Sequence, residues 1–207
     1  IGLMLKLELN TNYEGINFAM PTGDPSNITS VRYVLDVFLC PSNTHKAPTV
    51  AGGTTQPATP RFGYSDYRAN MAAGRDPNCT TTTDDPLACY FFENGISYAN
   101  SSVGMQDITD GASNTIMLGE VREGTWADAA SCCVRTTADN NRTINKPLLL
   151  GNNRQAFTYW SSLHPNQVNF AKCDGSVGPV NNQINKIVLV KLMTRNGGEA
   201  LSSTDFK

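Results

Sequence analysis

The chain has 207 residues, a length that suits one domain over 1–207 with a sizeable core. Charged residues make up only 16% of it, and 16 Lys and Arg nearly balance 18 Asp and Glu, for a formal net charge of −2. This balance argues against the basic footprint of a nucleic-acid-binding protein and against a polybasic membrane-binding surface.

Residues 3–18 fit two kinds of element. Leu3, Leu5, Leu7 and Leu9 alternate with other residues, as in a strand, whereas the content of Leu, Met, Lys and Glu favours a helix by propensity. The residue pattern alone leaves both open.

Strands are predicted where apolar or aromatic residues alternate over a short run. Polar stretches rich in Pro, Gly, Asn, Ser and Thr predict the loops between them. The predicted strands span 64–71, 90–92, 116–122 and 157–161. The predicted loops span 19–30, 42–60 and 74–88, with a short helix over 31–38, a compact turn over 107–115 and an irregular stretch over 123–155.

Residues 164–177 read H-P-N-Q-V-N-F-A-K-C-D-G-S-V and predict a hairpin. Apolar residues alternate with polar ones before Asp174-Gly175, a pair that favours a two-residue type I′ turn, and Val177 then begins the return strand. His164, a strand and a tight acidic turn are therefore held in a fixed relation.

A final helix is expected after the hairpin. Asn182 can cap its first turn, and Gly197 suits a left-handed C-terminal cap. Its apolar stripe comprises Ile184, Ile187, Val188 and Leu192. Antiparallel strands, few short helices and long loops together predict an α+β fold.

Four stretches in this order resemble the prepilin-type-processing-associated H-x9-DG family. They are F-L-C-P-S at 38–42, D-I-T-D-G-A-S-N-T-I-M-L-G-E at 107–120, the His164 to Asp174-Gly175 spacing, and L-M-T-R-N-G-G-E at 192–199. The resemblance runs from about residue 1 to the C-terminus and is weakest in insertions near 43–60, 74–90 and 127–148. It implies a pilin-like or pseudopilin-like globular head, and it favours the helix over 3–18.

The same resemblance implies export to the cell surface or the extracellular space of a bacterium. Its members begin with a basic leader and a long apolar helix, and this chain resembles them only downstream of that helix. The chain is then a truncated, processed or divergent member, and membrane contact is expected only through the missing helix. The longest apolar run, Ile187 to Leu192, is short and contains Lys191.

The six cysteines indicate an oxidising compartment. Their scattered spacing lacks a C-x2-C pair, so it favours disulfides over a zinc site, and reduced buried thiols are the alternative. Cys79 with Cys89 is the expected local bridge. Cys40 and Cys173 are expected to bond to the adjacent Cys132 and Cys133, a pairing favoured over a Cys132–Cys133 bond.

No set of catalytic residues stands out, and we expect no enzyme. His45 lies in a Pro-rich loop, and His164 is expected to hydrogen-bond to the acidic turn or to a backbone carbonyl. A hydrolase that uses His164 and Asp174 is the weaker reading.

The turn over 107–115 fits two interpretations. Asp107 and Asp110 with Asn114 are oxygen ligands that suit calcium, the one cofactor that the chain suggests, and Asp84 with Asp85 is a second such group. The simpler interpretation is that Asp110-Gly111 forms a turn in which Asn114 and Thr115 bond to loop backbone.

Glu120 lies in an otherwise apolar predicted strand, where a buried carboxylate needs a partner. Arg122, Arg195 or backbone amides are the candidates. Four N-x-Ser/Thr triplets, which are possible glycosylation acceptors, begin at Asn27, Asn78, Asn100 and Asn141.

Two functions are compatible with these features. The first is a secreted pilin-like structural subunit that associates with copies of itself or with other pilin-like chains. The second is an extracellular module that binds a solute or glycan, a role with which the family has also been grouped. Its stacking platform would comprise Tyr64, Tyr67, Trp126, Tyr159 and Trp160.

Overall fold

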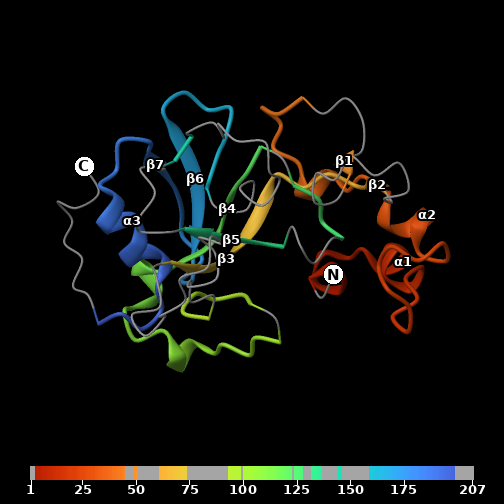
Figure 1. Cartoon of the computed structure of the whole chain (residues 1–207), viewed down its shortest axis with the longest axis horizontal. Helices are drawn as coiled ribbons and strands as arrows, with labels where there is room; N and C mark the ends of the chain where they lie inside the picture. Colours follow the sequence, from red (N-terminus) through yellow and green to blue (C-terminus); the bar gives the residue numbers. More distant parts are fainter. Residues whose placement is uncertain are drawn as a thin grey trace, which may run out of the picture.

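The computed structural model of the chain describes residues 3–44, 49–50, 61–73, 93–98, 100–122, 124–127, 132–136, 144–145 and 159–198. Its centre is a five-stranded sheet of order β5-β3-β4-β6-β7 (Figure 1). The strands are β3 (Tyr67–Ala73), β4 (Ile116–Glu120), β5 (Cys133–Thr136), β6 (Gln167–Lys172) and β7 (Val177–Asn181). All pairs are antiparallel except β3–β5, which is parallel. The predicted α+β class is confirmed at this level.

The main core lies between the sheet and α3 (Lys186–Met193). Trp160 and Phe170 meet edge to face in it, with ring centroids 5.2 Å apart, and both are essentially inaccessible to solvent. They press against Gly119 of β4, where an added Cβ would lie 2.6 Å from the Phe170 ring. The core therefore depends on the absence of a side chain at this point of the strand.

The hairpin forms, but its turn differs from the expected type I′. Gly175 has a positive φ of 84°, whereas Asp174 is not among the residues with positive φ. The Gly175 amide donates to the carbonyl of Lys172, and the Lys172 amide donates to the carbonyl of Ser176. This pattern is a type I turn followed by a left-handed glycine that forms a bulge. β7 is an outer strand and carries Pro179 opposite Asn169 of β6.

The final helix also begins later than expected. Asn185, not Asn182, caps α3, and its side chain accepts from the Ile187 amide at 2.8 Å. The helix ends at Met193 without a left-handed cap, and the residue with positive φ beyond it is Gly198 rather than Gly197. Pattern reasoning located the helix correctly but placed both of its caps wrongly.

The N-terminal residues form short helical elements on the opposite side of the sheet from α3 (Figure 1). They are η1 (Met4–Leu7), α1 (Asn10–Glu14), α2 (Ile28–Val31) and η2 (Asp36–Phe38). Met4, Ile16 and Leu35 form a small separate core beneath them. Of the two readings of residues 3–18, the helical one is confirmed, although it takes the form of two short pieces.

Four smaller elements lie outside the main sheet and the helices named above. A two-stranded sheet pairs β1 (Thr49–Val50) with β2 (Arg61–Phe62). Two 3-10 turns, η4 (Met105–Asp107) and η5 (Ala112–Asn114), precede β4.

Some sequence expectations fall outside these elements. Residues 159–161 of the expected strand 157–161 are not in a strand, and residues 90–92 lie outside the described part. No helix among the described residues is long and apolar enough to cross a bilayer.

Candidate functional site

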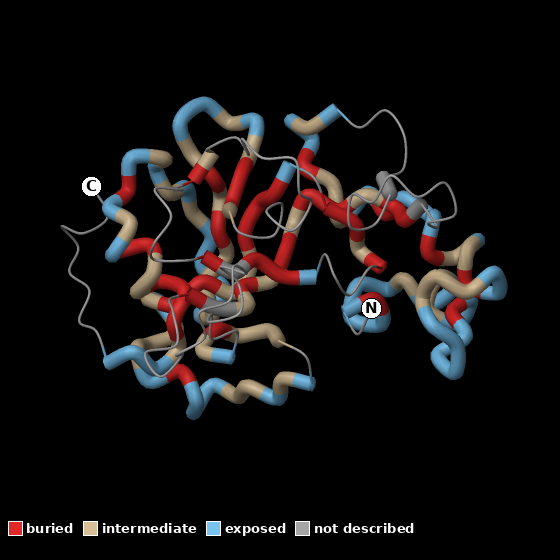
Figure 2. The backbone as a smooth tube through the Cα atoms, in the orientation of Figure 1, coloured by how far each residue is buried: buried red, intermediate tan, exposed pale blue. Residues whose placement is uncertain are grey.

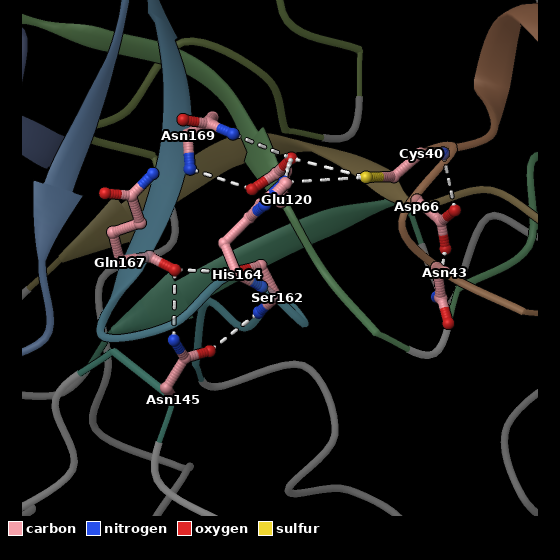
Figure 3. Close-up of polar contacts among 9 residues, drawn as sticks. All are labelled: Cys40, Asn43, Asp66, Glu120, Asn145, Ser162, His164, Gln167 and Asn169. Carbon is pink, nitrogen blue, oxygen red and sulfur yellow. Dashed lines mark hydrogen bonds and ion pairs between the residues drawn. The ribbon is translucent and has the colours of Figure 1, made fainter.

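Cys40, Glu120 and His164 converge at one point, although they are 44 to 124 positions apart in the chain (Figure 3). The His164 Nε2 atom lies 3.2 Å from Glu120 Oε1, and the Cys40 Sγ atom lies 3.7 Å from each of those two atoms. Cys40 and Glu120 are buried, and His164 is partly exposed. Cys40 follows η2, Glu120 ends β4 and His164 precedes β6, so the N-terminal segment meets the sheet here. Figure 2 shows that buried residues gather along the strands of this sheet.

Glu120 is fixed by β6, the first strand of the hairpin. It is the last residue of β4, and its carboxylate accepts from the backbone amide of Asn169 at 2.8 Å and from the Asn169 side-chain amide at 3.1 Å. Backbone amides were among the expected partners of Glu120, and the structure shows the amide of Asn169 in this place. These bonds compensate part of the cost of burying a carboxylate.

Cys40 is positioned by the loop after η2. Its backbone amide donates to Asp66 Oδ2 at 2.7 Å, and the other oxygen of Asp66 accepts from the Asn43 side chain at 2.7 Å. Asp66 is itself buried just before β3. The loop that bears the thiol is thus bonded to the start of the central sheet.

His164 is held by a polar network before β6 (Figure 3). Its backbone amide donates to Ser162 Oγ, which donates to the carbonyl of Gln167 at 2.6 Å. Asn145 accepts from the Ser162 amide and donates to the same carbonyl. The network fixes the loop that presents the imidazole to Glu120.

The arrangement is not that of a nucleophilic triad. In a Cys-His-carboxylate triad one ring nitrogen faces the sulfur and the other faces the carboxylate. Here Nε2 faces both Cys40 and Glu120, so the three groups surround a common point and do not form a relay. A group of sulfur, nitrogen and carboxylate oxygen around one point is a set that a metal ion of the zinc type can use.

Acidic groups predominate around this point. Burial raises the pKa of the Tyr67 hydroxyl, and the nearby Cys40, Glu120 and Asp66 raise it further. A small pocket of about 10 Å³, room for about one water molecule, adjoins the site, and its lining includes Cys40, Asp66, Glu120 and Arg122. A cation is favoured here over an anion.

The structure separates His164 from the acidic turn with which it was expected to bond. Asp174 Oδ1 accepts from the amide and hydroxyl of Ser176, which lower the pKa of its carboxyl group. The Asp174-Gly175 turn packs instead against the turn over 107–115, because the Cys173 amide donates to the carbonyl of Thr115. The His164 and Asp174 pair of the hydrolase reading is therefore not formed.

The cysteines differ from the expected pairing. Cys132 and Cys133 bond to each other, and Cys40 and Cys173 are free thiols. The reason is position, because Cys40 faces Glu120 and His164, whereas Cys173 follows β6 beside the turn. Cys79 and Cys89 lie outside the described residues, as do His45, Asp84 and Asp85.

The turn over 107–115 engages its polar groups internally. Asp107 accepts from the Gly104 amide, and Asp110 accepts from the amides of Gly197 and Gly198 at 2.7 and 2.8 Å. The side chains of Asn114 and Thr115 donate to the carbonyls of Asp110 and Gly111. Among the described residues these carboxylates are not part of a group of three that could hold a metal.

Of the other expected sites, Asn27 cannot be a glycosylation acceptor in the folded chain. Its side chain is fully buried and bonds to Asn17 and Pro21. Asn100 is exposed and has a positive φ of 59°, and Asn78 and Asn141 lie outside the described residues.

The proposed aromatic platform is not present as a unit. Trp160 is buried in the core, and Trp126 packs on the small N-terminal cores and donates to the carbonyl of Tyr33. The sequence did not predict that Cys40 lies beside Glu120 and His164. The available signal was that Cys40, Glu120 and His164 each occur in a different one of the four quoted stretches.

Comparison with known proteins identifies the family. A family model described as "Protein of unknown function (DUF1559)" matches residues 3–186, and the chain belongs to this family. No curated protein and no solved structure matches the chain.

Proposed function

We propose that this DUF1559 protein is an exported, pilin-like structural subunit that assembles with copies of itself through its N-terminal segment, residues 3–37. The proposal is supported by the exposure of many apolar side chains in residues 3–37. Among the described residues, large exposed apolar side chains concentrate there: Leu3, Leu5, Leu7, Phe18, Met20, Tyr33, Val34 and Val37.

Local structure explains why these side chains face outward. The turn η1 buries only Met4, so the leucines on either side of it remain outside the small core. Phe18 and Tyr33 are 57% and 60% exposed, far more than the sheet's own core residues. Soluble monomers seldom gather exposed apolar residues in one region, and such regions mark interaction surfaces.

The composition favours another copy of the chain as the partner. The formal net charge of −2 over 207 residues gives little repulsion between copies. A subunit of a repeating assembly needs such low self-repulsion together with an apolar contact region. Other pilin-like chains of similar surface are the second kind of partner that this reading includes.

Sedimentation velocity over a range of concentrations tests the assembly. We expect the wild-type chain to self-associate, and Phe18→Ser with Tyr33→Ser to weaken association at least about tenfold, since burial of such side chains is worth about 1.5–3 kcal/mol each. Val177→Ser with Ile187→Ser is the matched control, because these side chains are 72% and 66% exposed elsewhere. A monomer at every concentration, or equal effects of both pairs, would count against the proposal.

Location is the second part of the proposal. Immunogold electron microscopy of native cells is expected to place the protein at the cell surface, in filaments or secretion assemblies. Labelling confined to the cytoplasm would contradict export.

Binding of a solute or glycan is the second candidate. It is supported by an open polar pocket of about 450 Å³ whose lining includes Tyr98, Gln106, Asp107 and Arg195. The Arg195 guanidinium lies over the Tyr98 ring, 5.5 Å from its centroid, so a charged and an aromatic side chain stand together in the lining. A glycan array and a thermal-shift screen of small sugars test this reading, and hits that Asn196→Ala weakens would favour it over assembly.

A further inference from the structure

We infer that Cys40, Glu120 and His164 bind one divalent transition-metal ion of the zinc type. The three residues present sulfur, carboxylate oxygen and imidazole nitrogen within 4.8 Å of one another. Thiolate and imidazole are ligands that zinc accepts and that Ca²⁺ and Mg²⁺ do not favour.

The separations of the three atoms match a shared ion. Tetrahedral zinc with Zn–S of about 2.3 Å and Zn–N and Zn–O of about 2.0–2.2 Å places sulfur about 3.6 Å from its partners, and nitrogen about 3.4 Å from oxygen. The structure has 3.7 Å for both sulfur distances and 3.2 Å for nitrogen to oxygen. An ion therefore fits with side-chain movements of a few tenths of an ångström.

The surroundings resemble the outer shell of a metal site. Both side-chain and backbone amides of Asn169 hold the Glu120 carboxylate, and Asp66 holds the backbone at Cys40. Such outer-shell bonds orient ligands and are a regular part of metal centres. With three protein ligands, the fourth coordination position falls to water or to a small donor from the adjoining pocket.

The ion would join three separate parts of the chain. Cys40 follows η2 of the N-terminal segment, Glu120 ends β4, and His164 precedes β6. Binding displaces the Cys40 thiol proton to solvent and fixes the N-terminal segment to the sheet. The inference does not rest on the proposed assembly, because metal content is measured equally well on a monomer.

Metal binding by the whole purified chain tests the inference. Protein purified without reductant is first checked by mass spectrometry for a free Cys40 thiol, then stripped with chelator and titrated with Zn²⁺ or Co²⁺. We expect one ion per chain, a thiolate-to-cobalt charge-transfer band in the near ultraviolet, and a higher melting temperature with Zn²⁺.

Variants assign the ligands. Cys40→Ser, Glu120→Gln and His164→Gln are each expected to weaken binding by at least about 100-fold, since even outer-shell losses cost about 10–100-fold. Cys173→Ser and His45→Gln are the controls, because they remove the other free thiol among the described residues and the only other histidine of the sequence. Circular dichroism confirms that each variant is folded.

Three results would overturn the inference. They are no stoichiometric binding of either metal by the wild-type chain, a cobalt complex that lacks the thiolate band, or ligand variants that bind as tightly as the controls.

Discussion

Gly119→Ala is expected to destabilise the fold, whereas Gly178→Ala in the same sheet is not. An added Cβ at Gly119 would lie 2.6 Å from two Phe170 ring atoms and 2.7 Å from Trp160 Cε3. Carbon atoms in favourable contact are about 3.5–4.0 Å apart, so the methyl group overlaps both rings by about 1 Å. At Gly178 an added Cβ meets nothing within 4 Å.

The magnitude follows from two opposing effects. Overpacking a core costs about 1–3 kcal/mol, and neither ring can move freely because both are buried against each other. Replacing Gly with Ala restricts the unfolded chain and contributes about 0.4–1 kcal/mol of stability at either site. Gly119→Ala should therefore lower the free energy of unfolding by about 1–2 kcal/mol, and Gly178→Ala should raise it slightly.

Thermal unfolding followed by circular dichroism measures the difference. For a domain of this size 1 kcal/mol shifts the melting temperature by about 2–4 °C, so we expect Gly119→Ala to melt about 2–12 °C below Gly178→Ala. Urea denaturation of both variants provides a second measurement. If Gly119→Ala melts at or above Gly178→Ala, the packing of Trp160 and Phe170 on β4 is wrong.

Two further outcomes follow from buried groups. Asn27→Ala should lower the free energy of unfolding by about 1–3 kcal/mol, because it leaves a backbone amide and two carbonyls without their partner. Urea denaturation measures this change, and an equal decrease for Asn196→Ala, at an exposed position, would contradict the prediction. Burial, aided by the Asp174 charge, raises the pKa of the Cys173 thiol to about 11. Since the thiolate is the reactive form, iodoacetamide should modify Cys173 slowly near pH 8 and faster as the pH approaches 11. Mass spectrometry of the peptide follows this, and a rate at pH 8 equal to that of the unfolded chain would refute it.

The elements that the sequence predicted best are those specified by neighbouring residues. β4, the β6–β7 hairpin and α3 follow from local alternation, a turn pair and a helical stripe. The turn type was wrong because Asp174-Gly175 suits both a type I′ turn and the observed type I turn with a bulge, and only the strand register distinguishes them.

The remaining features depend on contacts between distant residues. β5 pairs in parallel with β3 across more than 50 positions, and local patterns do not encode such a partner. The same holds for the Cys40 thiol, because the Glu120 carboxylate and the His164 imidazole that it faces are 80 and 124 positions away. The number and spacing of the cysteines predicted a disulfide bond for Cys40. This prediction was wrong because spacing does not show which side chains a thiol faces in the fold.

One outer strand limits how copies of this chain can join. Pro179 lies midway along β7 and has no N–H, so a further strand laid against that margin would find a missing donor at its centre. Growth of a continuous intermolecular sheet from this side is thereby disfavoured. Copies that meet at β7 must do so through side chains, and the hydrogen-bond ladder of one subunit does not continue into the next across this strand.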